Sequence, residues 1–463
     1  MKIVHYMFGL PPVRTGGLFR YALDLAAEQK KLGLEVILLL PGAIQAHGNK
    51  IAIHYWKKWN TLPCYRIKNP LYIPNGYGVI EPDAFMTPCD KRVYSDWLRK
   101  VQPDVIHMHS LMGIHTEFLD AANEENIPII YTTHDYYGLC PKIDLMEYDH
   151  ECCNKDWTKC DKCCTKAYSL RRLRLEQSDI YRLYCSSPLL MQLVHSHMVN
   201  VLIHKVAKKS LKRVASSKVK TTNTSFEQLR YYYSKLFAKI NFFLFNSNQS
   251  QAIYEQHLGY LPGIVLPTIN STIYDNRKKR YYGKTLRLGY LGNAMPQKGF
   301  NYLINELTCM AKTGRTNFQL NTYMLDSDTH PFVHNSPPYK SEQLPQVFDD
   351  MDLLIVPSLW KETFGMVVIE AISYGVPVLI SKNVGARMVI EKTHGSGIVF
   401  PIKEGSLLQE LINIYDHREM LVAINQKIIT DSFCFDFKQH TKVITSQYIK
   451  VQKQIRMDRK NEC

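Results

Sequence analysis

The stretch Leu353-Leu-Ile-Val-Pro-Ser-Leu-Trp-Lys-Glu-Thr-Phe-Gly-Met-Val-Val-Ile-Glu370 decides the fold class. Its first four residues form an apolar run typical of a buried strand, and Pro357 interrupts that run. Gly365 begins a helical pattern that ends at Gly375, and residues 376–380 predict the next strand. A strand, a loop, a helix and a second strand together form the repeating unit of a parallel α/β sheet.

Two carboxylates lie in the loop and helix of this unit. Glu362 is in the loop and Glu370 is near the second turn of the helix. In parallel sheets, ligands bind beyond the carboxyl ends of the strands, and helix N-termini there favour anions. We therefore expect the glutamates to accept hydrogen bonds from sugar hydroxyls, and the backbone N–H groups of Gly365 and Met366 to face phosphate. Spacing alone fits a solvated loop charge and a helix-face charge equally well.

The N-terminal part of the chain repeats the same pattern. Residues 2–7 predict a strand, residues 18–32 a helix and residues 35–40 a second strand, which together form a Rossmann-type opening. Gly16 and Gly17 precede the helix. Paired glycines let the backbone approach a ligand closely and place N–H groups at a helix start, although a plain tight turn is the alternative.

Histidines follow two further predicted strands. Residues 104–110 end in His109, and residues 128–135 end in His134 and Asp135. Adjacent parallel strands would bring these side chains to one crevice, where a histidine can orient a sugar or donate to a phosphate. Structural histidines with satisfied hydrogen bonds are the alternative.

The run P-S-x-x-x-E-T-F-G-x-x-x-x-E-A-x-x-x-G-x-P-V at residues 357–378 is similar to the E-x7-E signature of glycosyltransferase family 4. Members of this family are retaining enzymes with the GT-B fold. The resemblance implies an α/β protein with two Rossmann-like domains facing across a cleft. It also implies that Glu362 holds the hydroxyls of the donor sugar and that Glu370 holds the ribose.

The resemblance extends to other segments. The T-x-H-D piece ending in His134 and Asp135 implies catalytic residues beside the reacting sugar, with His109 on the acceptor side. Gly16, Gly17, Gly365 and Met366 fall at positions that contact the donor diphosphate. Lys298 precedes a predicted helix and suits the same diphosphate, since charge-assisted bonds to phosphate are strong. Asn293 stands where family members commonly have an arginine, so one cation of the donor site is missing.

These patterns divide the chain into segments. We expect an N-terminal acceptor-side domain over residues 1–268, with a Cys-rich and basic helical insertion at about 140–240. A nucleotide-sugar-binding domain is expected over residues 284–436. A C-terminal helix over residues 437–463 is expected to cross back to the first domain.

Six of the twelve cysteines lie within residues 140–164. The C-x2-C spacing of Cys160 and Cys163 suits two ligands on one tetrahedral metal, and Cys140 together with Cys152 or Cys153 would complete the set. A structural zinc site is therefore predicted, with a group of reduced thiols as the alternative. The resemblance implies no metal or other cofactor for catalysis.

The formal net charge is +15, and residues 166–220 carry twelve cations against two anions. A basic helix with an apolar stripe can lie on an anionic membrane, whereas a solvated helical hairpin is the alternative. Nucleic acid is not expected as a partner, because no recognised binding motif is present. Neither a secretory signal nor an apolar run of transmembrane length is evident. We therefore expect a cytoplasmic protein, peripheral on the inner membrane face.

The predicted function is the transfer of a sugar from a nucleoside diphosphate sugar to a hydroxyl with retained configuration. The acceptor is expected to be a saccharide or a lipid-linked saccharide, in cell-surface polysaccharide or glycolipid biosynthesis. The alternative is a catalytically silent protein of GT-B shape that acts as a membrane or assembly scaffold. Asn293 is the feature that favours this alternative.

Overall fold

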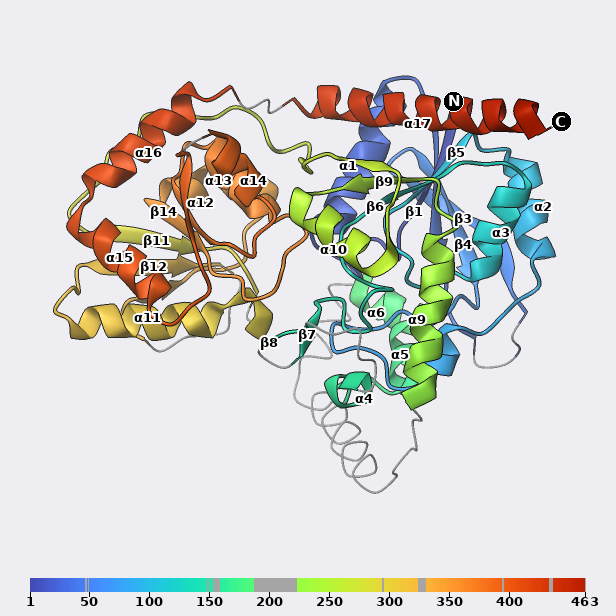
Figure 1. Ribbon diagram of the computed structural model, residues 1–463, viewed down its shortest axis with the longest axis horizontal. Helices are drawn as coiled ribbons and strands as arrows, with labels where there is room; N and C mark the ends of the chain where they lie inside the picture. Colours follow the sequence, from blue (N-terminus) through green and yellow to red (C-terminus); the bar gives the residue numbers. More distant parts are fainter. Residues whose placement is uncertain are drawn as a thin grey trace.

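The computed structural model has two lobes, each built on its own β-sheet (Figure 1). It describes residues 1–45, 48, 50–147, 150–152, 159–186, 223–293, 295–323, 330–393, 395–432 and 436–462. The segment 187–222 lies outside this range, so the structure does not address most of the basic membrane-binding segment predicted over residues 166–220.

The N-terminal sheet has eight strands in the order β10-β9-β6-β5-β1-β2-β4-β3. All neighbours pair in parallel except β3 and β4, which form an antiparallel hairpin at one edge. The strands are β1 (Lys2–Tyr6), β2 (Glu35–Pro41), β3 (Ala52–Trp59), β4 (Leu62–Lys68), β5 (Val105–Met108), β6 (Ile129–Thr132), β9 (Phe242–Phe245) and β10 (Gly263–Val265).

Helices cover both faces of this sheet, which explains why its central strands read as continuous apolar runs. Successive side chains of a strand point to opposite faces. Val105 packs in a cluster with α1 (Gly17–Lys31) and α17 (Phe437–Glu462), whereas Ile106 packs in a cluster with α2 (Arg92–Val101) and α3 (Thr116–Glu124). The C-terminal helix α17 runs along the N-terminal lobe, at the top of Figure 1.

The C-terminal sheet is wholly parallel, with the strand order β13-β12-β11-β14-β15-β16. Its strands are β11 (Leu286–Tyr290), β12 (Phe318–Thr322), β13 (Val333–Asn335), β14 (Leu353–Val356), β15 (Val378–Ser381) and β16 (Gly397–Phe400). One face is covered by α11 (Phe300–Lys312) and α15 (Ser406–Asp416). The other is covered by α12 (Leu344–Asp349), α13 (Met366–Ser373), α14 (Arg387–Thr393) and α16 (Glu419–Thr430).

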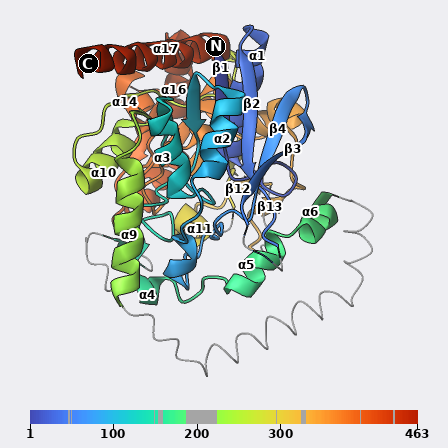
Figure 2. The same ribbon diagram turned by 90° about the vertical axis from the view of Figure 1, so that its right-hand side faces the viewer.

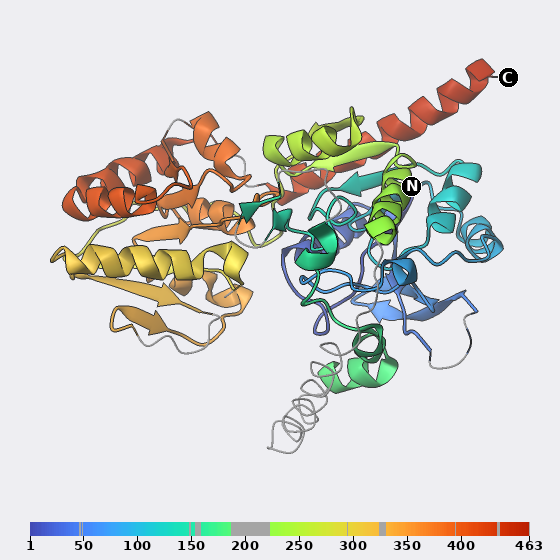
Figure 3. The ribbon, with the colours of Figure 1, turned by 60° about the horizontal axis from the view of Figure 1, so that its bottom comes forward.

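Short elements of the Cys-rich region and of the segment after it project from the N-terminal lobe (Figures 2 and 3), and one of them, α4 (Cys160–Cys163), lies beside α9 (Asn223–Phe237). The others are the hairpin β7 (Met146–Glu147) and β8 (His150–Glu151), and the helices α5 (Leu170–Glu176) and α6 (Asp179–Ser186). The helix α10 (Asn248–Leu258) follows β9 and lies toward the C-terminal lobe.

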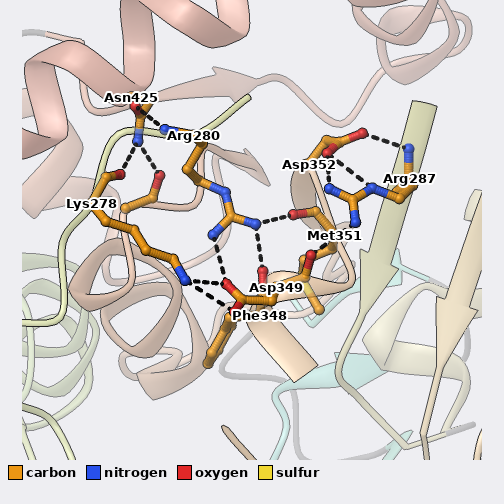
Figure 4. A network of polar contacts seen from close by, with 9 residues as sticks. Lys278, Arg280, Arg287, Phe348, Asp349, Met351, Asp352 and Asn425 are labelled. Carbon is orange, nitrogen blue, oxygen red and sulfur yellow. Dashed lines mark hydrogen bonds and ion pairs between the residues drawn. The ribbon is translucent and has the colours of Figure 1, made fainter. Parts of the chain in front are cut away.

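The segment that connects the two sheets is fastened to the C-terminal lobe by a buried arginine (Figure 4). Arg280 is 8% exposed and donates to the backbone oxygens of Phe348 and Met351, both at 2.7 Å. Asn425 accepts from the Arg280 N–H at 3.1 Å and donates to the oxygen of Lys278, also at 3.1 Å. These bonds satisfy backbone oxygens that would otherwise be buried without a partner.

We expect Arg280→Met to lower the free energy of unfolding by about 2–4 kcal/mol, because two buried carbonyl groups would lose their donor. The nearby ion pair of Lys278 with Asp349, at 2.7 Å, joins two half-exposed side chains. The matched control Lys278→Met should therefore cost less than about 1 kcal/mol. Urea denaturation checks both values, and equal losses in the two variants would contradict this account.

Candidate active site

The loop after β14 carries Glu362 to the interface between the two lobes. Glu362 is 6% exposed, and its Oε1 lies 2.8 Å from the Lys298 ammonium nitrogen. The Ser358 hydroxyl also donates to Glu362 Oε1. Gly299, next to Lys298, has a φ of +77° and packs against the start of the Glu362 loop. A Cβ at this position would lie 2.0 Å from the Pro357 oxygen, so only glycine lets the two segments come this close. The structure therefore pairs Lys298 and Glu362, which the sequence analysis had placed in separate roles.

The surroundings of Glu362 keep it ionised. Burial acts to raise its pKa, but the Lys298 charge and the hydrogen bonds from Lys298 and Ser358 outweigh burial. The net result is a pKa below the ordinary value for glutamate. The site thus holds a buried carboxylate against the ammonium group of a partly exposed lysine.

Two helix N-termini face each other across the interface. Gly16 caps α1 with φ of +119°, and Gly365 caps α13 with φ of +97°. A Cβ on Gly17 would lie 2.6 Å from the Met366 Cε atom, so the two helix starts are in contact. Neither start has a side-chain cap among the described residues, so backbone N–H groups of both helices are left for another acceptor.

One turn further along the same two helices, Arg20 of α1 lies 3.4 Å from Glu370 of α13. Asn270 donates to the same Glu370 oxygen, at 3.4 Å, and Arg20 also donates to the Thr272 hydroxyl. Burial raises the pKa of Glu370, and the Arg20 charge opposes that rise. The sequence analysis missed Arg20 and Asn270. The position of Arg20 three residues after Gly17, on the same helix face, was the available signal.

The histidines lie in one hydrogen-bonded chain at the ends of β1, β5 and β6. His134 Nε2 lies 3.1 Å from His109 Nδ1, and His109 Nε2 lies 3.0 Å from His5 Nδ1. The chain ends at Gln29 Oε1, 2.7 Å from His5 Nε2. His134 is partly exposed, whereas His109 is fully buried. The acceptor-side position expected for His109 is corrected: this residue contacts His134 and is covered from solvent.

This series of hydrogen bonds determines which ring nitrogen of each histidine carries the proton. Gln29 Nε2 donates to the Tyr448 hydroxyl of α17 at 3.2 Å, so Gln29 Oε1 accepts from His5 Nε2–H. His5 Nδ1 then accepts from His109, and His109 Nδ1 accepts from His134. Burial lowers the pKa of His5 to about 4 and that of His134 to about 3, which keeps both rings neutral. His134 therefore carries its proton on Nε2, and its Nδ1 is an acceptor.

We expect Tyr448→Phe to lower the free energy of unfolding by about 1–3 kcal/mol, because buried polar atoms lose a partner. The hydroxyl contacts both Gln29 and His107 Nδ1, the latter at 2.6 Å. The control Tyr281→Phe changes a side chain that is 79% exposed, and its effect should be within about 0.5 kcal/mol. Chemical denaturation measures the loss, and ¹⁵N NMR of the histidine rings reports their tautomers. An unchanged stability in Tyr448→Phe would contradict the network.

Asp135 and Asn293 each close a local turn. The Asp135 carboxylate accepts from the Tyr137 N–H at 2.9 Å, and burial raises its pKa to about 6. The side chain predicted to be catalytic thus stabilises its own turn. Asn293 is exposed, and its side-chain oxygen accepts from the Met295 N–H at 3.3 Å.

The predicted zinc ligands gather in one region but do not form a compact metal set within the described part of the chain. Cys140, Cys152 and Cys160 lie around the Arg230 guanidinium of α9. Burial raises the pKa of Cys140 to about 12 and that of Cys160 to about 11. Cys153, another cysteine of the cluster, lies outside the described residues.

Three ligand atoms lie within 4.8 Å of one another at His5, His107 and His109. Each of these rings already has hydrogen-bond partners at both nitrogens. For His107 they are Tyr448 and Thr132, at 2.6 and 2.7 Å. The hydrogen-bonded network therefore accounts for the histidine cluster without a metal.

The Cys-rich hairpin contacts the Glu362 loop. Glu151 of β8 forms an ion pair with Lys361, and the Tyr136 and Trp360 rings meet edge to face at 6.3 Å. The Thr363 hydroxyl donates to the His134 oxygen at 2.9 Å. The loop that carries Glu362 is thus held against the N-terminal lobe at both ends. Within the described residues, none of the helices is both long and apolar enough to cross a membrane.

Each of the two lobes contains a segment that matches a known protein family. Residues 15–155 match the family described as Glycosyltransferase Family 4, and residues 328–429 match the one described as Glycosyl transferases group 1. The fold and the family matches thus identify a glycosyltransferase with the GT-B arrangement of two lobes. More particularly, the N-terminal lobe matches the family 4 model and the C-terminal lobe matches the group 1 model, each over less than half of the chain. The predictions of the fold class and of a glycosyltransferase are confirmed.

One curated relative is 27% identical over 128 residues, which is 27% of this chain and 35% of the relative. It is an uncharacterized 41.2 kDa protein in the cps region of Klebsiella pneumoniae, and the match spans about a third of its length. Among solved structures, sucrose-phosphate synthase from Thermosynechococcus elongatus has a TM-score of 0.56 and 12% identity, with coverage of 97% of this chain and 98% of that one.

A second solved structure is the pneumococcal O-GlcNAc transferase GtfA in complex with UDP and GlcNAc. It has a TM-score of 0.54 and 10% identity, and the match covers 97% of this chain and 99% of that one. At these identities, both likenesses show the fold alone.

Proposed function

We propose that the protein transfers a sugar from a nucleoside diphosphate sugar to a hydroxyl group, with retention at the anomeric carbon. One observation carries the proposal: two uncapped helix starts, at Gly17 and Met366, meet across the lobes, and Glu362, in the loop that leads into the second of them, pairs with Lys298. This arrangement offers positive charge to a diphosphate and a carboxylate to sugar hydroxyls.

The leaving diphosphate is the group that gains charge as the sugar departs, so stabilising it accelerates the reaction. Lys298 has three N–H donors and can bind phosphate while it remains bonded to Glu362. The N–H groups at the starts of α1 and α13 would supply further donors. The UDP and GlcNAc bound to the pneumococcal transferase support a nucleotide-sugar donor here.

The bond changes in the proposed reaction are simple. The bond between the anomeric carbon and the phosphate oxygen breaks, and a bond from that carbon to the acceptor oxygen forms. The acceptor proton passes to the departing phosphate oxygen, as the resemblance to retaining family 4 enzymes implies. Glu362 would accept hydrogen bonds from the donor sugar. Glu370 would accept hydrogen bonds from the ribose after its ion pair with Arg20 has broken. The partly exposed His134, with Nδ1 as an acceptor, would contact the sugar near the reacting carbon.

We place the acceptor among saccharides or lipid-linked saccharides of cell-surface polysaccharide or glycolipid biosynthesis. The relative in a cps region supports this setting. Attachment to the inner membrane face through the basic segment 166–220 is part of the same proposal, and sedimentation with anionic vesicles would test it. No metal is proposed for catalysis. A structural zinc at the cysteines would be detected by elemental analysis of the purified protein.

The central experiment is nucleotide release without acceptor. Purified protein is incubated with UDP-, GDP-, dTDP- and ADP-sugars, and the free nucleotide is measured. We expect release from donors of one base, and NMR of the product decides between retention and inversion. A failure to release nucleotide, together with no thermal shift from any nucleotide, would contradict transfer and support the scaffold alternative that Asn293 favours.

A further inference from the structure

A cavity of about 290 Å³ lies at the carboxyl edge of the N-terminal sheet. It is lined by residues 8–14 after β1, by the end of β2, by β3 and β4, and by the α5–α6 segment. This is the edge of a parallel sheet where ligands bind. Its volume is near the lower end of ligand pockets, which are roughly 300–1,000 Å³.

Three arginines from different segments line this cavity: Arg14 from the loop after β1, Arg66 from β4 and Arg182 from α6. Burial lowers the pKa of all three, and the neighbouring Arg182 charge lowers that of Arg66 further, to about 10. They remain charged at neutral pH. Like charges brought together and partly desolvated are costly unless an anion compensates them.

Among the described lining residues, the carboxylates balance this charge only in part: Glu176 acts on Arg14, and Asp179 acts on Arg66 and Arg182. Four cations line the cavity with Lys57 included, against Glu176 and Asp179. Asp179 pairs with Arg66 at 3.3 Å, but its side chain is 71% exposed, and Glu176 is bonded to Arg172 at 3.0 Å. The cavity wall therefore has an excess of positive charge.

Two hydrogen-bond donors in the wall are buried and have no acceptor among the described residues. They are Arg66 Nε and Gln177 Nε2. Gln177 is 2% exposed, and its oxygen accepts from the Ile73 N–H at 2.9 Å, which fixes the direction of the amide. Buried donors without partners are rare in native proteins and indicate an acceptor that binds there.

The guanidinium of Arg66 is held in place by an aromatic ring. Its Cζ atom lies 3.1 Å from the centre of the Trp56 ring, a cation–π arrangement. Arg182 is held by donation to the oxygens of Pro41 and Gly42, at 3.0 and 2.8 Å. The positive wall is thus fixed in place before any ligand binds, which lowers the cost of binding.

We propose that this cavity binds an anionic group of the acceptor, a phosphate or a carboxylate attached to the saccharide. The proposal rests on the proposed glycosyl transfer and specifies its acceptor. All lining residues lie between Phe8 and Leu183, in the N-terminal lobe, whereas Lys298 and Glu362 of the donor site lie in the other lobe. The wall presents donors and positive charge, which match oxyanions better than neutral hydroxyls.

Isothermal titration calorimetry of the full-length protein tests this binding. The probes are glucose 1-phosphate, glucuronic acid and, as a neutral match, glucose. We expect an anionic probe to bind at least 10-fold more tightly than glucose, and its affinity to fall as the salt concentration rises. Preference for the phosphate indicates a phosphate-linked acceptor, such as a lipid-linked one, and preference for glucuronic acid indicates an acidic saccharide. Either preference supports the proposal.

Variants locate the bound anion. Arg14→Gln and Gln177→Glu should each weaken anion binding at least 10-fold, whereas Arg171→Gln, an exposed arginine of α5, should not. Circular dichroism shows whether each variant is folded. If Gln177→Glu does not fold, Arg14→Gln alone tests the proposal. Equal binding of glucose and the anions, or full anion binding by Arg14→Gln, would overturn the proposal.

Loss of binding in Lys298→Met but not in Arg14→Gln would place the anion in the donor site and overturn it as well. Nucleotide binding by the wild-type protein is measured separately. Failure of the donor site and failure of this cavity are therefore distinguishable results.

Discussion

Replacing Glu362 with glutamine should lower the rate of sugar transfer by about 100-fold or more, the range seen when a preorganised polar group is removed from an active site. The change keeps the size of the side chain but removes the charge that pairs with Lys298 at 2.8 Å. A neutral amide also accepts hydrogen bonds from sugar hydroxyls less strongly than a carboxylate does. Initial rates of nucleotide release at saturating donor measure this effect.

The matched control for this variant is Glu404→Gln, which changes an exposed glutamate in the same lobe. Its rate should equal that of the wild-type protein. Thermal unfolding of both variants separates a loss of chemistry from a loss of folded protein. A Glu362→Gln rate within threefold of the wild type would exclude the role proposed for this carboxylate.

Replacing Lys298 with methionine should also lower transfer by about 100-fold, because the leaving diphosphate loses a charge-assisted donor. It should change the pH dependence too. Burial acts to raise the pKa of Glu362, and Lys298 is the main influence that opposes it. Without Lys298 the pKa of Glu362 rises, so the acid limb of the rate profile should move to higher pH.

The contribution of Glu362 to stability should change with pH in opposite directions in the wild-type protein and in Lys298→Met. In the wild type the folded-state pKa of Glu362 is lowered, so its contribution is present above the unfolded-state value of about 4.3. That contribution is lost as pH falls through the folded-state pKa. In Lys298→Met the folded-state pKa is raised, so stability falls as pH rises through it. Denaturation between pH 3 and 7, compared with that of the exposed control Lys312→Met, tests this inversion. An identical pH dependence in all three proteins would contradict it.

Local sequence patterns were sufficient for much of the fold. The apolar run at 353–356 becomes β14, and the helical pattern after Gly365 becomes α13. Gly16 takes a positive φ at the start of α1, as its place before a helix suggests. These features depend on backbone conformation and on neighbours within a few residues, and such information is contained in the order of the residues.

The sequence also predicted Glu362, Lys298 and His134 as site residues, but it could not show which residues they contact. Arg20 and Glu370 are 350 positions apart and meet because two helix starts from different lobes face each other. His134 owes its tautomer to Gln29 and to Tyr448 of the last helix. The order of strands and the closure of the lobes decide such contacts, and no local pattern records them.

The cysteines and arginines show the same division. The C-x2-C spacing drew attention to Cys160, but the charged neighbour of its thiol is Arg230, from a helix that follows much later in the chain. Arg14, Arg66 and Arg182 are unremarkable as single residues. The sequence by itself determined the two α/β lobes and the strand, loop and helix that carry Glu362. The tertiary structure decided the pairing of charges, because packing brings together groups that are distant in the chain and removes them from water, where their interactions become strong.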